Sequence, residues 1–156
     1  MTESPERREL RFDNLDQVVA EVEQLASGQV KTTGNHSFGQ IIEHLARTHD
    51  LCTGKLVGPK PPWFMRLMIP LMKGSMLKDK PLKPGFNLPP AAENFFWPAG
   101  EVDVQQAIDH LKQSVENYQT KGALPKHPIF GKITKAQNLN LNCRHAAMHL
   151  SFAHPA

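Results

Sequence analysis

Helical periodicity of apolar residues constrains the fold of this chain more than any other feature. Apolar residues recur every three or four positions in four segments, which span residues 16–26, 37–53, 103–121 and 134–153. Such spacing places them along one face of an α-helix. No segment shows convincing strand alternation, and no repeat of fixed period is present. We therefore predict an all-α fold built as a bundle of four long helices.

Capping patterns mark the starts of three of these helices. Ser37 with Gln40, and Thr134 with Gln137, form capping boxes. In such a box the hydroxyl accepts a bond from the glutamine amide, while the glutamine side chain reaches back to the first residue. Asp103 is a typical N-cap for the third helix. These patterns predict where the helices begin.

Residues 58–100, between the second and third long helices, hold most of the thirteen prolines of the chain. We predict a long, irregular, proline-rich crossover there, with one short amphipathic helix at 63–76 that Pro70 kinks or breaks. Crossovers of this length in a compact domain commonly serve as a lid, a wall of a binding site or an oligomer contact. Because 63–76 lacks a long cationic face, we interpret its apolar stripe as core or interface rather than as a membrane-surface helix.

Length and composition favour a single domain over residues 1–156. A chain of 156 residues with 40% hydrophobic content can bury a core without disulfides. Cys52 and Cys143 match no disulfide or zinc spacing, which favours a reducing, cytoplasmic location. No apolar leader is present, and no apolar run is long enough to cross a bilayer. A net charge of +3 without a nucleic-acid motif leads us to expect neither a nucleic acid nor a membrane as partner.

Two of the eight histidines, His145 and His149, lie four residues apart in the last helix. On a helix this spacing brings two imidazoles close enough to share a metal ion. Zinc proteases use the same spacing, but the glutamate between their histidines is lacking here, which excludes that class. A third ligand has to come from another element, and His44, beside the buried stripe of the second helix, is the best candidate. Because chance pairs at this spacing are common, hydrogen-bonded core histidines are the competing interpretation.

We interpret the other histidines as structural. His49 lies five residues from His44, on a different face of the helix, and is expected to be a surface or capping residue. His110 is expected at the surface, and His154 at a fraying chain end. His127 precedes a proline and is expected to order a loop.

Three stretches of the chain resemble a known family. "GNHSFGQIIEHLA", "HPIFGKITKAQ" and "RHAAMHL" are similar to the DUF1569 family, a branch of the DinB/YfiT-like superfamily, and the similarity covers most of the chain. The resemblance implies a DinB-like four-helix bundle in which His44, His145 and His149 bind a divalent metal, commonly nickel or zinc. It also implies a small-molecule substrate and transfer or isomerisation chemistry with a low-molecular-weight thiol such as bacillithiol or mycothiol.

The chain departs from the superfamily pattern near these residues. His36 stands where relatives often carry tryptophan, Gln137 and Asn138 replace the usual Glu-Trp, and Leu150 follows the last histidine in place of arginine or glutamine. These changes reduce the number of polar side chains that could support the ligands of a metal site. Two hypotheses follow: a metal-dependent, thiol transferase-like enzyme, and a non-catalytic small-molecule-binding or stress-response bundle that keeps a relic histidine triad.

No general base is assigned. Glu43 adjoins His44 but points about 100° away around the helix, and Cys143 faces away from His145 and is interpreted as structural. The contiguous apolar residues of 63–76 favour a homodimer, because such a patch is unusual on a monomer surface. Aromatic residues of the crossover are expected to form apolar walls over the ion: Trp63, Phe64, Phe86, Phe95, Phe96 and Trp97.

Overall fold

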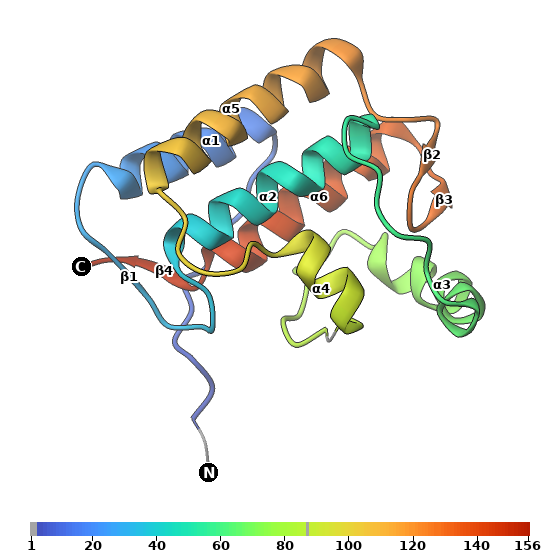
Figure 1. Ribbon diagram of the computed structural model, residues 1–156, viewed down its shortest axis with the longest axis horizontal. Coiled ribbons are helices and arrows are strands. Elements are labelled where there is room, and N and C mark those ends of the chain that lie inside the picture. Colours follow the sequence, from blue (N-terminus) through green and yellow to red (C-terminus); the bar gives the residue numbers. More distant parts are fainter. Residues whose placement is uncertain (1–2, 87) are drawn as a thin grey trace.

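The computed structural model describes residues 3–86 and 88–156, and this part of the chain is mostly helical (Figure 1). The prediction of a mainly helical fold is confirmed. The helices are α1 (Leu15–Ala26), α2 (Phe38–Thr53), α3 (Trp63–Met76), α4 (Pro90–Phe96), α5 (Val104–Lys121) and α6 (Lys135–Leu150).

The predicted helix starts are confirmed by their caps. Ser37 and Gln40 form a complete capping box at the start of α2, and Thr134 and Gln137 form one at the start of α6. The side chain of Asp103 accepts a bond from the amide of Gln106 at the start of α5. Each bond satisfies an amide that has no partner within its helix, so the sequence sets these boundaries locally.

Helices α1, α2, α5 and α6 pack around one apolar core (Figure 1). Helix α2 lies against both α5 and α6, and it therefore buries residues on several of its faces. Gly39 allows the segment before α5 to pass close to α2, since a Cβ at this position would lie 2.3 Å from the carbonyl oxygen of Val102. The largest fully buried apolar side chains come from all four helices: Leu15, Val18, Val22, Ile42, Leu45, Leu111 and Leu150.

Two short antiparallel strand pairs accompany the helices, which the sequence did not predict. Strand β1 (Val30–Thr32) pairs with β4 (Ala153–Pro155), and β2 (Lys126–His127) pairs with β3 (Gly131–Lys132). Strands of two or three residues are too short to show alternation in the sequence. The first pair joins the segment after α1 to the chain end after α6, so His154 lies in a strand pair rather than at a frayed end.

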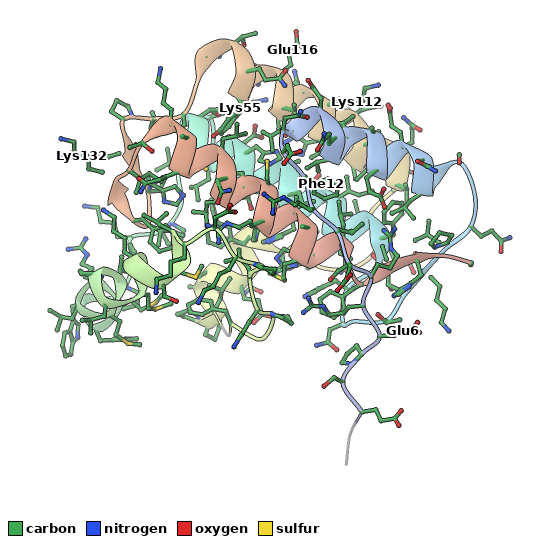
Figure 2. The ribbon with its side chains drawn as sticks, turned by 180° about the vertical axis from the view of Figure 1, so that it is seen from behind. Glu6, Phe12, Lys55, Lys112, Glu116 and Lys132 are labelled. Carbon is green, nitrogen blue, oxygen red and sulfur yellow. The ribbon has the colours of Figure 1, made fainter. Side chains whose placement is uncertain are left out.

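The proline-rich crossover is more regular than predicted. Helix α3 continues through Pro70 instead of ending there, and α4, which was not predicted, starts with Pro90 in its first turn. Helix α3 has no buried residue, so its apolar stripe does not belong to the core, and the alternative of an interface stays a prediction. It lies outside the body formed by the four long helices, and Figure 2 shows it from behind at the outer edge of the molecule.

Hydrogen bonds to backbone carbonyls tie the crossover to α6. Arg144 is buried and donates to the carbonyl oxygens of Met76, at 2.6 Å, and Lys80, at 3.1 Å. Lys73 donates to the carbonyl of Lys132 at 2.7 Å. Arg144 therefore closes the last turn of α3, where carbonyls lack helical partners.

Among the described residues, no helix is both long and apolar enough to cross a membrane.

Candidate metal centre

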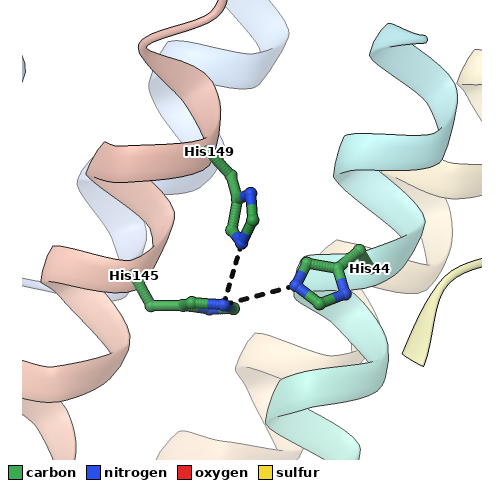
Figure 3. Close-up of side chains that lie close together, drawn as sticks. All are labelled: His44, His145 and His149. Carbon is green, nitrogen blue, oxygen red and sulfur yellow. Dashed lines mark hydrogen bonds between the residues drawn. The ribbon is translucent and has the colours of Figure 1, made fainter. Parts of the chain in front are cut away.

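Three imidazoles converge between α2 and α6 (Figure 3). The Nε2 atom of His145 lies 3.3 Å from Nε2 of His44 and 3.0 Å from Nε2 of His149. Each of the three side chains offers one ligand atom, and these atoms all lie within 4.8 Å of one another. The structure thus brings together the three residues that the sequence singled out.

Helix packing explains this convergence. His145 and His149 are one turn apart on α6, and each points towards α2, which lies alongside. Leu45 and Ala146, the neighbours in sequence of His44 and His145, both belong to the apolar core. Protein nitrogens bind zinc at about 2.0–2.1 Å, so ligand nitrogens on one ion lie about 2.9–3.4 Å apart in octahedral or tetrahedral arrangements. The two short separations fit this range.

The backbone of the crossover fixes the tautomer of His44. Its Nδ1 atom lies 3.0 Å from the carbonyl oxygen of Phe96, and a carbonyl can only accept a hydrogen bond, so Nδ1 carries the proton. A neutral His44 then directs the lone pair of Nε2 at the other two rings. Metal-binding histidines usually donate their other ring nitrogen to such an acceptor. His44 is therefore oriented as a ligand.

Burial keeps the three rings neutral. It lowers the pKa of His145 to about 4. It also lowers the pKa of His44 and His149 well below the usual value, and the nearby His145 adds to both effects because like charges repel. Only a neutral imidazole has a free lone pair, so these shifts favour cation binding over protonation at neutral pH.

Aromatic stacking closes one side of the triad. The ring of Trp97 lies parallel to the ring of His44 with centroids 3.8 Å apart, and parallel to the ring of His36 with centroids 3.6 Å apart. The rings of His36 and His44 are both too close to the centroid of Trp97 to lie on the same face of the indole. Trp97 is therefore sandwiched between them. Its edge contact with His149 has a centroid distance of 5.1 Å. Trp97 therefore forms an apolar wall, and His36 supports it from outside. The prediction of such walls is wrong for Trp63, Phe64 and Phe86, which are exposed to solvent.

Glu43 faces away from the triad, as predicted, and belongs to a separate charged cluster. It pairs with Arg47 at 3.2 Å and with Nδ1 of His110 at 2.9 Å, while Nε2 of His110 lies 2.7 Å from Asp50. Hydrogen bonding to Glu43 raises the pKa of His110 despite its partial burial. His110 is thus a half-buried link between α5 and α2 rather than the surface residue that we predicted.

The prediction for His49 is wrong. Its side chain is only 1% exposed, and Nδ1 lies 3.1 Å from the hydroxyl oxygen of Ser114 on α5. Its spacing already indicated burial, because His49 follows Ile42 by seven residues and Leu45 by four, and both lie in the apolar stripe. The spacing from His44 was misleading, since α2 is covered on more than one face.

His127 orders its loop, as predicted. Its Nδ1 atom accepts bonds from the backbone amides of Ile129 and Phe130 at 3.0 and 3.1 Å. Its Nε2 therefore carries the proton and faces the sulfur of Cys52 at 3.9 Å, so this imidazole cannot deprotonate the thiol. Burial raises the pKa of Cys52 and raises that of Cys143 to about 11. Both cysteines are buried and unreactive by this criterion.

Gln137 and Asn138, which stand where the resemblance led us to expect Glu-Trp, make contacts away from the triad. Gln137 completes the capping box of α6, and Asn138 accepts bonds from Tyr118 and Asn142 at 2.5 and 2.9 Å. None of these three contacts reaches the triad. The structure places these substitutions in helix capping and core hydrogen bonding.

Comparison with known proteins gives one family match. The model of the family described as "Protein of unknown function (DUF1569)" matches residues 4–156. No curated protein and no solved structure shows significant similarity to the chain. Since the match covers nearly the whole sequence, the chain belongs to the DUF1569 family.

Proposed function

We propose that this protein binds a divalent metal ion, nickel or zinc, through Nε2 of His44, His145 and His149. We further propose that it is a DinB/YfiT-like protein that uses this ion as a transferase, acting on a small molecule with a low-molecular-weight thiol. The convergence of three Nε2 atoms at separations of 3.0 and 3.3 Å carries the proposal.

The tautomer of His44 strengthens the case for a cation. With its Nδ1 proton donated to Phe96, His44 presents a lone pair to the nitrogen of His145 at 3.3 Å. Nε2 of His145 in turn lies 3.0 Å from Nε2 of His149. A single proton on Nε2 of His145 cannot make a good hydrogen bond to both His44 and His149. Lone pairs that converge in a partly buried place repel one another unless a positive charge lies between them. A divalent ion supplies that charge.

The arrangement of the helices also supports a DinB-like four-helix bundle. In this reading α1, α2, α5 and α6 are the four bundle helices, and α3 and α4 lie in the crossover between the second and the third. One ligand then comes from the second bundle helix and two come from the last. Metal sites in bundles are commonly built in this way, from side chains of facing helices.

A divalent ion held by three neutral imidazoles supplies Lewis acidity that lowers the pKa of a thiol or water towards neutrality. The protein's own contribution is to hold the rings and to shape the space beside them. Phe96 fixes the ring of His44 through its carbonyl, and Trp97 covers one face of that ring. Trp97 thereby excludes water from this face of the ring.

Metal analysis of the protein without a histidine tag tests the proposal. We expect one nickel or zinc ion per chain by elemental analysis, and a titration curve that is lost in His145→Ala and His149→Ala. His154→Ala is the matched control, because this histidine lies in β4 and contacts the carbonyl of Glu6. If the wild type takes up no stoichiometric ion, or if the two triad variants bind it unchanged, the proposal fails.

The thiol step needs its own assay. A thiol bound to the ion loses its proton, so adding bacillithiol or mycothiol to the metal-loaded protein is expected to release a proton and to change the absorption spectrum of a nickel-loaded sample. His44→Ala should abolish both changes. If the metal-loaded protein shows neither change with either thiol, the proposal of metal binding stands but the proposal of a transferase fails.

One observation favours a second candidate, a non-catalytic small-molecule-binding bundle with a relic triad. Of the three triad histidines, only His44 has a protein acceptor for its outer ring nitrogen within residues 3–86 and 88–156. His145 and His149 lack this support, which commonly raises metal affinity by 10–100-fold. Retention of a small molecule from cell extract by the chelator-treated protein would favour this candidate, whereas metal-dependent turnover would exclude it.

A further inference from the structure

Helix α3 presents five large apolar side chains to solvent. Their exposed fractions are 75% for Trp63, 48% for Phe64, 68% for Leu67, 53% for Met68 and 84% for Leu71. Positions i, i+1, i+4, i+5 and i+8 lie on one arc of a helix, which we call the outer arc. The opposite arc holds half-buried apolar residues, and Arg66 and Lys73 lie between the two arcs. A contiguous exposed patch of this kind marks an interaction surface.

The segment that carries the outer arc has positive charges only, and Asp79, which follows it, pairs with Arg11. Residues 51–78 contain no aspartate or glutamate. None of their cations forms an ion pair with any residue of the described ranges 3–86 and 88–156. The outer arc is therefore flanked by positive charge that the chain itself does not neutralise. The cations of this segment are Lys55, Lys60, Arg66, Lys73 and Lys78.

We propose that the outer arc of α3 binds the surface of an anionic lipid bilayer. The helix would lie in the plane of the interface, with its aromatic and aliphatic side chains among the acyl chains and the flanking cations on the headgroups. Amphipathic segments with Trp, Phe and Leu on one face and with neighbouring Lys and Arg bind membranes in this way. The proposal is independent of the metal site.

The charge pattern selects a bilayer over a second copy of this chain. Two copies packed through the outer arc would bring two cationic, acid-free segments together, and like charges at an interface oppose association. The expectation of no membrane contact rested on the lack of a long cationic face on α3, and the expectation of a homodimer rested on its contiguous apolar residues. The structure leaves the outer arc exposed, and positive charge also lies beside the helix, at residues such as Lys60 and Lys78.

Vesicle sedimentation with the full chain tests the proposal. We expect binding to vesicles of equimolar phosphatidylglycerol and phosphatidylcholine, little binding to phosphatidylcholine alone, and a loss of binding in high salt. The double variant Trp63→Ser with Leu67→Ser should weaken binding by about tenfold or more. Leu124→Ser is the matched control, because Leu124 is an exposed apolar residue outside α3.

A charge-matched pair of variants tests the electrostatic part. Lys60→Gln with Lys78→Gln should weaken binding to the anionic vesicles by about tenfold or more, while Lys31→Gln with Lys121→Gln, which removes equal charge elsewhere, should change it little. All the substituted side chains in these two pairs are exposed, so circular dichroism should show an unchanged helical content.

Three results would overturn the proposal. They are no binding to the anionic vesicles, equal binding to both kinds of vesicle, and a dimer in sedimentation velocity that the Trp63→Ser, Leu67→Ser variant dissociates while vesicle binding is absent. The third result would identify a second copy of the chain as the occupant of the outer arc.

Discussion

The buried His49 should make the metal-free protein sensitive to mild acid. Burial lowers its pKa from the ordinary value of 6.5 to about 3, and the nearby His145 and His110 add to the shift. The folded state therefore binds fewer protons than the unfolded state below pH 6.5. The contribution of His49 to stability is complete above pH 6.5 and is lost as the pH falls towards 3. From these two pKa values, lowering the pH from 7.5 to 5.0 decreases the free energy of unfolding by about 2 kcal/mol, because His49 takes up a proton in the unfolded state only.

The variant His49→Gln isolates this effect, because glutamine can donate to Ser114 but does not titrate. Urea unfolding in the presence of a chelator should show that the stability gap between wild type and variant narrows by about 2 kcal/mol from pH 7.5 to pH 5.0. Ser114→Ala, which removes the partner at 3.1 Å but leaves the imidazole buried, should keep the wild-type pH dependence. A gap between wild type and His49→Gln that stays constant over this range would refute the reasoning.

Three further changes have defined outcomes. In a Trp63→Phe background, where Trp97 is the remaining tryptophan, nickel should quench fluorescence, because the indole lies 3.8 Å from the His44 ring, and His145→Ala should abolish the quenching. Arg144→Ala should destabilise the fold by about 1–3 kcal/mol and expose the crossover to limited proteolysis, since bonds to Met76 and Lys80 are lost; Lys135→Ala, at an exposed position of the same helix, is the control. Gly39→Ala should cost about 1–3 kcal/mol in thermal unfolding, because the methyl would meet the Val102 carbonyl at 2.3 Å, whereas Gly74→Ala, with nothing within 4 Å, should cost nothing.

The sequence predicts what depends on local pattern. The four long helices and their caps follow from apolar spacing and from residues such as Ser37 and Thr134, whose bonds are made within four residues. The triad could be predicted for a related reason. The spacing of His145 and His149 is local, and the inward direction of His44 follows from the apolar stripe beside it. Local rules of this kind hold whatever the remainder of the chain does.

Features that depend on the path of the crossover could not be predicted. The carbonyl of Phe96 and the ring of Trp97 reach His44 only because α4 returns across α2, more than fifty residues along the chain. An apolar stripe such as that of α3 indicates a helix with a face to cover, but it does not identify what covers it. Whether that face is core, interface or exposed is decided by tertiary packing, which here leaves Leu71 84% exposed.

The crossover is held by both helices that carry the triad. On α2, His44 donates to the carbonyl of Phe96 and stacks on Trp97, and on α6 the residue next to His145, Arg144, holds the carbonyls at the end of α3. Displacing α4 would remove the acceptor that keeps the Nδ1 proton of His44 in place, and the lone pair of Nε2 would lose its fixed direction. The position of the crossover and the readiness of the triad to bind a cation are therefore set by the same contacts.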